Sequence, residues 1–215
     1  MTGIQWADWI RPGDVIVDVG ANAGSFTKAF AAATGATGRV IAFEPDPAMA
    51  SRCRALATEG APIEVRECAV GARQESSPFY VSKNPTQNTR YQATIAKAVR
   101  SALVVDCVTL DAELAGLMIH GLKIDAQGDD GWVLMGARET LARMPARAWV
   151  LFELWPEGLR QSGFDLRSCA DLCQGWTVVA QGKSYTETTQ TLDRILLDAT
   201  NWQQHKHTNV LLRKG

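Results

Sequence analysis

The sequence predicts an α/β fold, in which helices cover both faces of a mostly parallel β-sheet. Short apolar runs rich in Val and Ile alternate along the chain with segments whose apolar residues recur at helical spacing. A glycine-rich loop follows the first run, and acidic residues close several of the runs. Strands of a parallel sheet are covered on both faces and read as continuous apolar runs, so this alternation favours a parallel arrangement.

The first half of the chain shows the pattern most clearly. The apolar run at 15–19 follows the turn-forming residues 12–14 and predicts a buried strand. Asp46 and Pro47 are typical of a helix start, because a capping residue is followed by proline at the first helical position. The expected elements of this half are strands at 15–19, 39–43 and 63–67 and helices at 25–34 and 46–58.

A polar stretch from residue 71 to about residue 100 is too long for a simple connection, so it predicts an insertion that is part strand and part loop. The further expected elements are strands at 104–108, 122–124, 149–152, 176–180 and 210–212 and helices at 111–117, 129–143, within 156–174 and at 191–199. We therefore expect a single domain over residues 1–215, with the insertion at about 76–102.

The composition is that of a folded protein of one domain. Of the 215 residues 46% are hydrophobic and 21% are charged, and the formal net charge is −1. A balance this even argues against a general nucleic-acid binder. The apolar stretches are too short for a membrane helix, and residues 1–14 lack the pattern of a signal peptide, so we expect a cytoplasmic protein without a membrane partner.

Five cysteines are scattered along the chain without a CxxC pair, and none has a histidine close to it in sequence. This spacing predicts reduced thiols and no metal site. Cys169 and Cys173 lie one helical turn apart and are expected to pack in the core. His205 and His207 leave a metal pair open, but a solvated strand edge is the simpler interpretation.

The glycine-rich loop at 20–24 raises the question of a nucleotide. A dinucleotide fingerprint requires G-x-G-x-x-G, yet Asn22 and Ser25 stand where its second and third glycines would be. An Asn side chain blocks the approach of a pyrophosphate to the backbone. A nicotinamide oxidoreductase is therefore the weaker alternative, and the pattern favours a ligand without a pyrophosphate.

S-adenosylmethionine is such a ligand, and the strand ends suit its groups. The acidic strand end at Asp18 suits its ammonium, and the N–H groups of the loop and helix start suit its carboxylate. Glu44 closes the second strand, where a carboxylate accepts both hydrogen bonds of a ribose diol. Ligands of open parallel sheets lie beyond the carboxyl ends of the strands, where Asp125 and Glu153 are also expected.

Four blocks, in the same order, resemble the FkbM-type methyltransferases, which use S-adenosylmethionine. They are VIVDVGANAGSFT, AFEPDP, TLD at 109–111 and KIDAQGDDGWVLMGA, and together they cover roughly residues 14–153. The resemblance implies a Rossmann-like sheet of seven strands whose last strand is antiparallel. It also implies O-methyl transfer to a hydroxyl of a small molecule, such as a sugar or a natural product.

The resemblance also implies roles for residues at the strand ends. The glycine-rich loop would line the methionine end of the cofactor, and Glu44 would hold the ribose. The residues after the third strand would lie near the adenine, and Asp125 would face the methyl group and the acceptor. The expected cofactor-binding residues are Asp18, Gly20, Asn22, Gly24, Glu44, Cys68, Ala69 and Asp125.

The fourth block departs from the family pattern K-I-D-x-E-G-x-E, because Gln127 replaces the first Glu and Asp130 stands at the second. This loss of a carboxylate leaves open a non-catalytic relative that binds cofactor or a partner without turnover. Asp125 and Glu153 are the expected catalytic residues, since each is placed to accept the proton of an acceptor hydroxyl. The insertion is the expected place of acceptor specificity. The sequence names neither the acceptor nor the oligomeric state, monomer or homo-oligomer.

Overall fold

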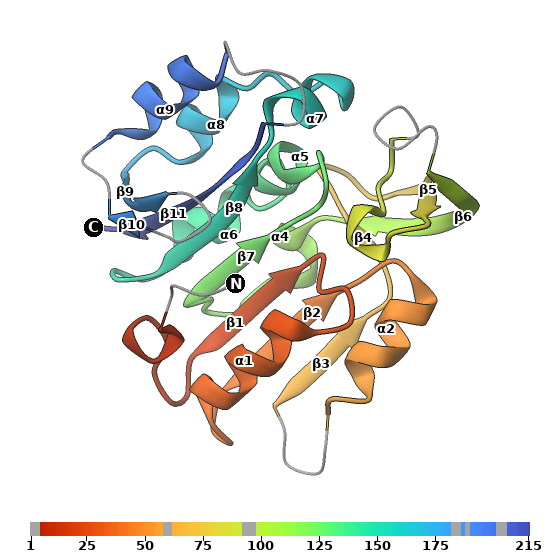
Figure 1. Ribbon diagram of the computed structural model, residues 1–215. Coiled ribbons are helices and arrows are strands. Elements are labelled where there is room, and N and C mark those ends of the chain that lie inside the picture. Colours follow the sequence, from red (N-terminus) through yellow and green to blue (C-terminus); the bar gives the residue numbers. More distant parts are fainter. Residues whose placement is uncertain (1–4, 58–61, 92–97, 182–185, 188–189, 201–205) are drawn as a thin grey trace.

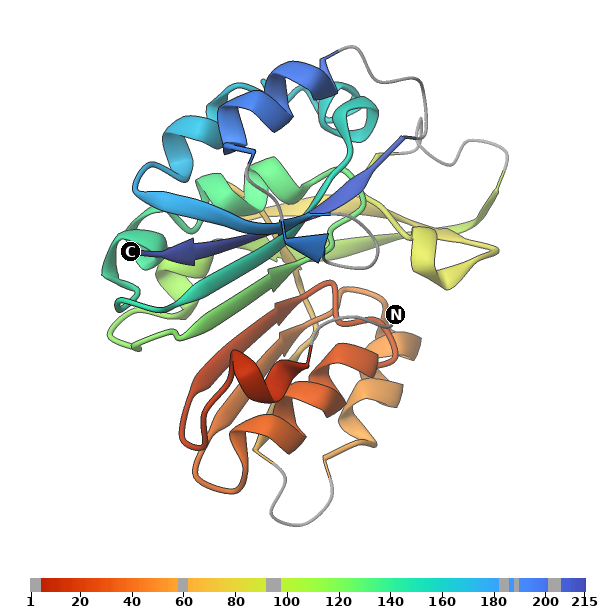
Figure 2. The ribbon, with the colours of Figure 1, turned by 60° about the vertical axis from the view of Figure 1, so that its left-hand side comes forward.

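An eight-stranded sheet runs through the molecule, with helices packed on both of its faces (Figures 1 and 2). The computed structural model describes residues 5–57, 62–91, 98–181, 186–187, 190–200 and 206–215. The strands of this sheet are β1 Val15–Val19, β2 Arg39–Phe43, β3 Ile63–Arg66, β7 Gly121–Ile124, β8 Trp149–Leu154, β9 Trp176–Gln181, β10 Thr186–Glu187 and β11 Thr208–Lys214. Their spatial order is β10-β9-β11-β8-β7-β1-β2-β3.

The strand directions agree with the predicted topology. β1, β2, β3, β7 and β8 are parallel, whereas β11 lies between β8 and β9 and runs antiparallel to both. The mostly parallel sheet with an antiparallel last strand is therefore confirmed, and the two-residue β10 extends it at one edge. Because β1 has β2 on one side and β7 on the other, the carboxyl ends of these three strands meet at one place.

Side chains that alternate along the strands build a separate core on each face of the sheet. Ile16 and Val40 pack in one core with residues of α1, while Val17 and Ile41 pack in the other with residues of α4 to α9. Both cores are closed to solvent. The helices outside the insertion are η1 Trp6–Asp8, α1 Ser25–Thr34, α2 Pro47–Arg54, α4 Leu110–Glu113, α5 Asp130–Met135, α6 Arg138–Arg143, α7 Pro156–Gln161, α8 Ser168–Leu172 and α9 Leu192–Ala199.

The polar insertion folds as a small sheet of its own beside the main one (Figure 1). The small sheet consists of β4 Ala69–Val70, which precedes the insertion, β5 Glu75–Ser82 and β6 Val99–Val108, with β6 between the two other strands. The insertion also contains η2 Pro85–Gln87. The strand expected at 104–108 is thus the end of a longer strand outside the main sheet. Its side chains explain this, because most of them are exposed or half-buried and Val104 is 80% exposed, whereas the central strands β1, β2, β7 and β8 of the main sheet are buried on both faces.

The single helix predicted at 129–143 is wrong, since the chain forms α5 and α6 with a break at Gly136. A Cβ on Gly136 would lie 2.0 Å from the carbonyl oxygen of Gly71, so the backbone of another segment packs against the break. The carboxylate of Asp111 then caps α6, accepting hydrogen bonds from the backbone N–H groups of Glu139 (3.0 Å) and Thr140 (2.7 Å). Tertiary contacts therefore decide where the helix is interrupted.

Two further helices are shorter than predicted. α2 ends at Arg54 rather than at residue 58, which lies outside the described residues, and α4 ends at Glu113 rather than at 117. Gly116, at φ +76°, has the left-handed backbone that ends helical structure after α4. Of the helices in the described part of the chain, none is long and apolar enough to cross a membrane.

Replacing Asp111 with Ala should lower the free energy of unfolding by about 1–2 kcal/mol, the usual cost of losing a helix cap. Urea unfolding followed by circular dichroism would measure the change. Asp106→Ala on exposed β6 is the matched control and should change stability little. Equal stabilities of the two variants would contradict the capping role.

Candidate functional site

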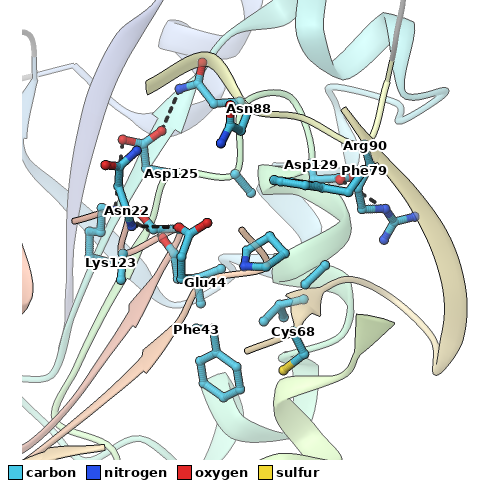
Figure 3. Close-up of a pocket in the computed structure, with 18 of the residues that line it drawn as sticks. Asn22, Phe43, Glu44, Cys68, Phe79, Asn88, Arg90, Lys123, Asp125 and Asp129 are labelled. Atoms are coloured by element: carbon cyan, nitrogen blue, oxygen red, sulfur yellow. Dashed lines mark hydrogen bonds and ion pairs between the residues drawn. The ribbon is translucent and has the colours of Figure 1, made fainter. Parts of the chain in front are cut away.

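A pocket of about 180 Å³ lies where the carboxyl ends of β1, β2 and β7 meet (Figure 3). Its walls come from five stretches of chain, within 19–26, 43–45, 68–70, 79–90 and 123–129. In Figure 3 Glu44 lies between two groups of side chains, with Asn22 and Asp125 on one side and Arg90 and Asp129 on the other. Glu44 therefore lies among these polar side chains and not at one end of the group.

The loop after β1 is held against two neighbouring strands. Gly20 has φ +70°, and a Cβ there would lie 2.0 Å from the carbonyl oxygen of Asp125, so this position requires glycine. The N–H groups of Gly20 (3.0 Å) and Ala21 (3.1 Å) both donate to the carbonyl oxygen of Phe43. These contacts pin the loop between β2 and β7 and keep its backbone close to the pocket.

Glu44 is the buried acid at the end of β2. One carboxylate oxygen accepts a hydrogen bond from the N–H of Asn22 (2.7 Å) and the other from the N–H of Asp46 (2.9 Å). Burial raises its pKa to about 7, and these two backbone donors oppose that rise. Each carboxylate oxygen has a second lone pair, so Glu44 can still accept hydrogen bonds from a ligand in the pocket.

Asp18 lies behind the loop instead of lining the pocket. Its carboxylate accepts a hydrogen bond from the hydroxyl of Thr27 (2.6 Å) and forms an ion pair with the Lys123 ammonium (3.1 Å). Lys123 also donates to the carbonyl oxygens of Val19 (3.1 Å) and Gly20 (2.8 Å). Burial alone would lower the pKa of Lys123, but the carboxylates of Asp18, Asp125 and Asp130 together outweigh it and the pKa is raised.

Gly24 likewise faces away from the pocket. It has φ +86° at the start of α1, and a Cβ there would lie 2.4 Å from Leu56 Cδ1 and 3.0 Å from Cys53 Sγ. Its lack of a side chain therefore allows α1 to pack against α2 and the residues after it. Of the eight residues expected to bind cofactor, six line the pocket: Gly20, Asn22, Glu44, Cys68, Ala69 and Asp125.

The two expected catalytic residues are joined by the side chain of Gln127. Its amide nitrogen donates to Asp125 Oδ1 (2.7 Å) and to Glu153 Oε2 (3.3 Å). Asp125 lines the pocket with a 40% exposed side chain, whereas Glu153 lies outside the lining at the end of the neighbouring strand β8. The structure thus brings both carboxylates together and adds an amide whose bridging position the sequence did not reveal.

Three consecutive residues, 88–90, fasten the insertion across the pocket. Asn88 donates to Asp46 (2.9 Å), and the Thr89 hydroxyl donates to the carbonyl oxygen of Gln127 (3.0 Å). Arg90 forms ion pairs with Glu75 (3.0 Å) and with Asp129 (3.4 Å), whose pKa burial raises to about 6. Sequence reasoning missed Phe79, Thr86 and Asp129 as lining residues, because no local pattern shows which part of the insertion folds back.

The wall near Cys68 and Ala69 is mostly apolar, because Phe43 and Val70 belong to the core cluster against which Cys68 packs. Burial raises the pKa of Cys68 to about 12, so its thiol is neutral at physiological pH and adds no charge. A flat, apolar group of a ligand can therefore contact this wall without losing hydrogen bonds.

The remaining candidate side chains lie away from the pocket. Cys169 and Cys173 are buried in the core, as expected. His120 lies at the opposite end of the sheet, where its Nδ1 accepts a hydrogen bond from the N–H of Val15 (3.1 Å). His207 lies 3.7 Å from a Glu153 oxygen, and His205 is outside the described residues. Within the described ranges no group of three or more metal-ligating side chains occurs.

Comparison with known proteins gives one family and several solved structures of similar fold. The model of the methyltransferase FkbM domain matches residues 18–169. No curated protein matches the chain by sequence comparison. A methyltransferase FkbM structure from Methylobacillus flagellatus KT is 14% identical with a TM-score of 0.55, over 97% of this chain and 49% of that one. This chain therefore spans about half the length of that relative.

Two further solved structures have the same fold. An rRNA methylase from Streptococcus thermophilus is 13% identical with a TM-score of 0.51, over 97% of this chain and 90% of that one. Fibrillarin from Aeropyrum pernix, in complex with natively bound S-adenosyl-L-methionine, is 11% identical with a TM-score of 0.51, over 95% of this chain and 68% of that one.

Replacing Lys123 with Met should lower the free energy of unfolding by about 3–5 kcal/mol, because it leaves the buried Asp18 carboxylate without its cation. Adding Asp18→Asn to Lys123→Met should recover part of that loss, since no charge is then left buried. Lys28→Met on the exposed face of α1 is the matched control. Chemical unfolding of the wild type, Lys123→Met, Asp18→Asn and the double variant would give the coupling energy, and additive losses would contradict the ion pair.

Proposed function

Because the chain belongs to the FkbM methyltransferase domain family, we propose that it is an S-adenosylmethionine-dependent methyltransferase that methylates a hydroxyl group of a small molecule. The observation that carries the proposal is Glu44, a buried carboxylate in the middle of the pocket with lone pairs left for a ligand. A ribose presents two neighbouring hydroxyls that match such an acceptor. The close backbone at Gly20 and the apolar wall near Cys68 supply the rest of the fit.

Different residues of the pocket would hold different parts of the cofactor. Glu44 would accept hydrogen bonds from the ribose, and the apolar wall at Cys68 and Ala69 would contact the adenine. Gly20 and Asn22 would lie along the methionine part, and the carboxylate of Asp125 would lie near its reactive end. When bound, S-adenosylmethionine supplies a methyl group on a sulfonium sulfur, which keeps the electron pair of the broken carbon–sulfur bond.

The remaining chemical task is to align an acceptor hydroxyl and to receive its proton, because a neutral hydroxyl is a weak nucleophile. Asp125 is exposed enough to contact the acceptor, and Glu153 is linked to it through Gln127. Either carboxylate can accept the proton as the oxygen–carbon bond forms. The Gln127 amide fixes the distance between these two proton acceptors.

The same observations give less support to the alternative functions, which are a dinucleotide-dependent enzyme, a nucleic-acid methyltransferase and a relative without turnover. A dinucleotide needs room for a pyrophosphate at the loop, where Asn22 lies at φ 53° and its N–H is already bound to Glu44. The structural neighbours include rRNA methylases, but the formal net charge of −1 does not favour a nucleic-acid acceptor. A relative without turnover would bind cofactor normally, so only an acceptor assay separates it from an enzyme.

Isothermal titration calorimetry with S-adenosylmethionine and S-adenosylhomocysteine should show binding to the wild-type protein. Glu44→Ala should weaken it about 100-fold, because two hydrogen bonds to a charged group are lost. Glu67→Ala, an exposed glutamate after β3, is the matched control and should bind normally. Failure of the wild-type protein to bind either ligand at high micromolar concentration would refute the proposed cofactor.

Binding of S-adenosylhomocysteine should depend on pH through Glu44. Hydroxyl donors favour the ionised carboxylate, so affinity should be constant above the pKa of about 7 and fall by up to tenfold per pH unit below it. Among neighbouring charges, Asp46 raises this pKa and Lys123 lowers it. Dissociation constants measured from pH 5.5 to 8 for wild type and Glu44→Gln would test this, since the variant should lose the dependence.

A further inference from the structure

The side chains of Asp125, Gln127 and Glu153 form a connected group at one end of the pocket, which we name the carboxylate clamp. Asp125 follows β7, Glu153 lies near the end of β8, and the two strands are parallel neighbours. The Gln127 amide nitrogen lies 2.7 Å from Asp125 Oδ1 and 3.3 Å from Glu153 Oε2. An amide nitrogen only donates, so both carboxylates act here as acceptors.

The backbone of Gln127 is held in an unusual conformation to make this bridge. Its φ of +50° is rare for a residue other than glycine, and such outliers persist where the surroundings hold them in place. The Thr89 hydroxyl donates to its carbonyl oxygen (3.0 Å), and the following Gly128 has φ +102°. The insertion therefore takes part in placing the amide between the two carboxylates.

The charges around the clamp are mainly negative. Lys123 lies 4.0 Å from Asp125 Oδ2, but it is nearer to Asp18, at 3.1 Å. Beneath the clamp, buried Asp130 accepts a hydrogen bond from the N–H of Glu153 (3.3 Å). The imidazole of His207 lies 3.7 Å from Glu153, and the Arg90 guanidinium is paired with Glu75 and Asp129. A ligand group that reaches the clamp therefore meets a surplus of hydrogen-bond acceptors.

We infer that the carboxylate clamp is the acceptor-recognition site, that Gln127 is its positioning residue, and that it takes an acceptor with hydrogen-bond donors, hydroxyl or ammonium, around the methylated atom. An anionic acceptor group, such as a phosphate or carboxylate, is disfavoured there because like charges repel in a partly buried site. The inference rests on the proposed function, since it requires the reactive end of the cofactor to lie beside Asp125. It adds the chemical class of the groups that the acceptor presents beside the methylated atom, and it assigns their recognition to the clamp that Gln127 holds together.

Sinefungin tests the inference without a known acceptor. In this analogue an amino-bearing carbon replaces the sulfonium and its methyl group, so its ammonium reports the charge at the point of methyl transfer. S-adenosylhomocysteine has a neutral sulfur there. The wild-type protein should bind sinefungin about tenfold more tightly than S-adenosylhomocysteine, measured by calorimetry at pH 7.5.

Two variants distinguish recognition of the ammonium group from a purely structural role of the clamp. Gln127→Met removes the bridging amide at similar size, and Glu153→Gln removes a charge outside the pocket lining. Each should weaken sinefungin more than S-adenosylhomocysteine, so that the preference for sinefungin falls to about threefold or less. Gln174→Met, at an exposed glutamine beyond α8, is the matched control and should change neither value.

The outcomes distinguish this inference from the function on which it rests. A wild-type protein that binds both ligands equally, or variants that weaken both ligands alike, would overturn the clamp while leaving the cofactor assignment intact. A wild-type protein that binds neither ligand would refute the proposed function, and the clamp with it. A selective loss of sinefungin preference in both variants supports the clamp.

Discussion

The buried ammonium group of Lys123 is the interaction around which the site is built. It comes from β7 and reaches under the loop that follows β1, where it meets the Asp18 carboxylate and the carbonyl oxygens of Val19 and Gly20. A charge this deeply buried is stable only with such a complete set of partners. The shape of the loop, and with it one wall of the pocket, thus depends on a residue about one hundred positions away in sequence.

Glu44 performs the corresponding task on the other side of the loop. Its two oxygens tie the N–H of Asn22 to the start of α2 at Asp46, and Asp46 in turn accepts a hydrogen bond from Asn88 of the insertion. The same burial that makes these bonds strong also raises the pKa of the carboxylate to about 7. One side chain therefore organises three segments and remains a hydrogen-bond acceptor for a ligand.

Local sequence patterns were sufficient to predict the strands and the helix that position the site. The bounds of β1, α1 and β2 agree with the sequence prediction, because apolar runs, a glycine-rich loop and helical spacing are all short-range signals. The same reasoning placed Glu44 and Asp125 at strand ends on the ligand side, where the pocket lies. It assigned Asp18 and Gly24 to the ligand as well, although one pairs with Lys123 and the other makes room for helix packing.

The amino-acid sequence by itself determined the α/β class, the loop after β1 and the acidic strand ends, since each depends on neighbouring residues. Only the tertiary structure decided which side chains share a partner. Gln127 meets Glu153 across 26 positions because β7 and β8 are adjacent in the sheet, and Arg90 reaches Asp129 because the insertion folds back. Such contacts arise from strand order and packing, which no local pattern encodes, and they convert a set of strand ends into a pocket with a defined charge.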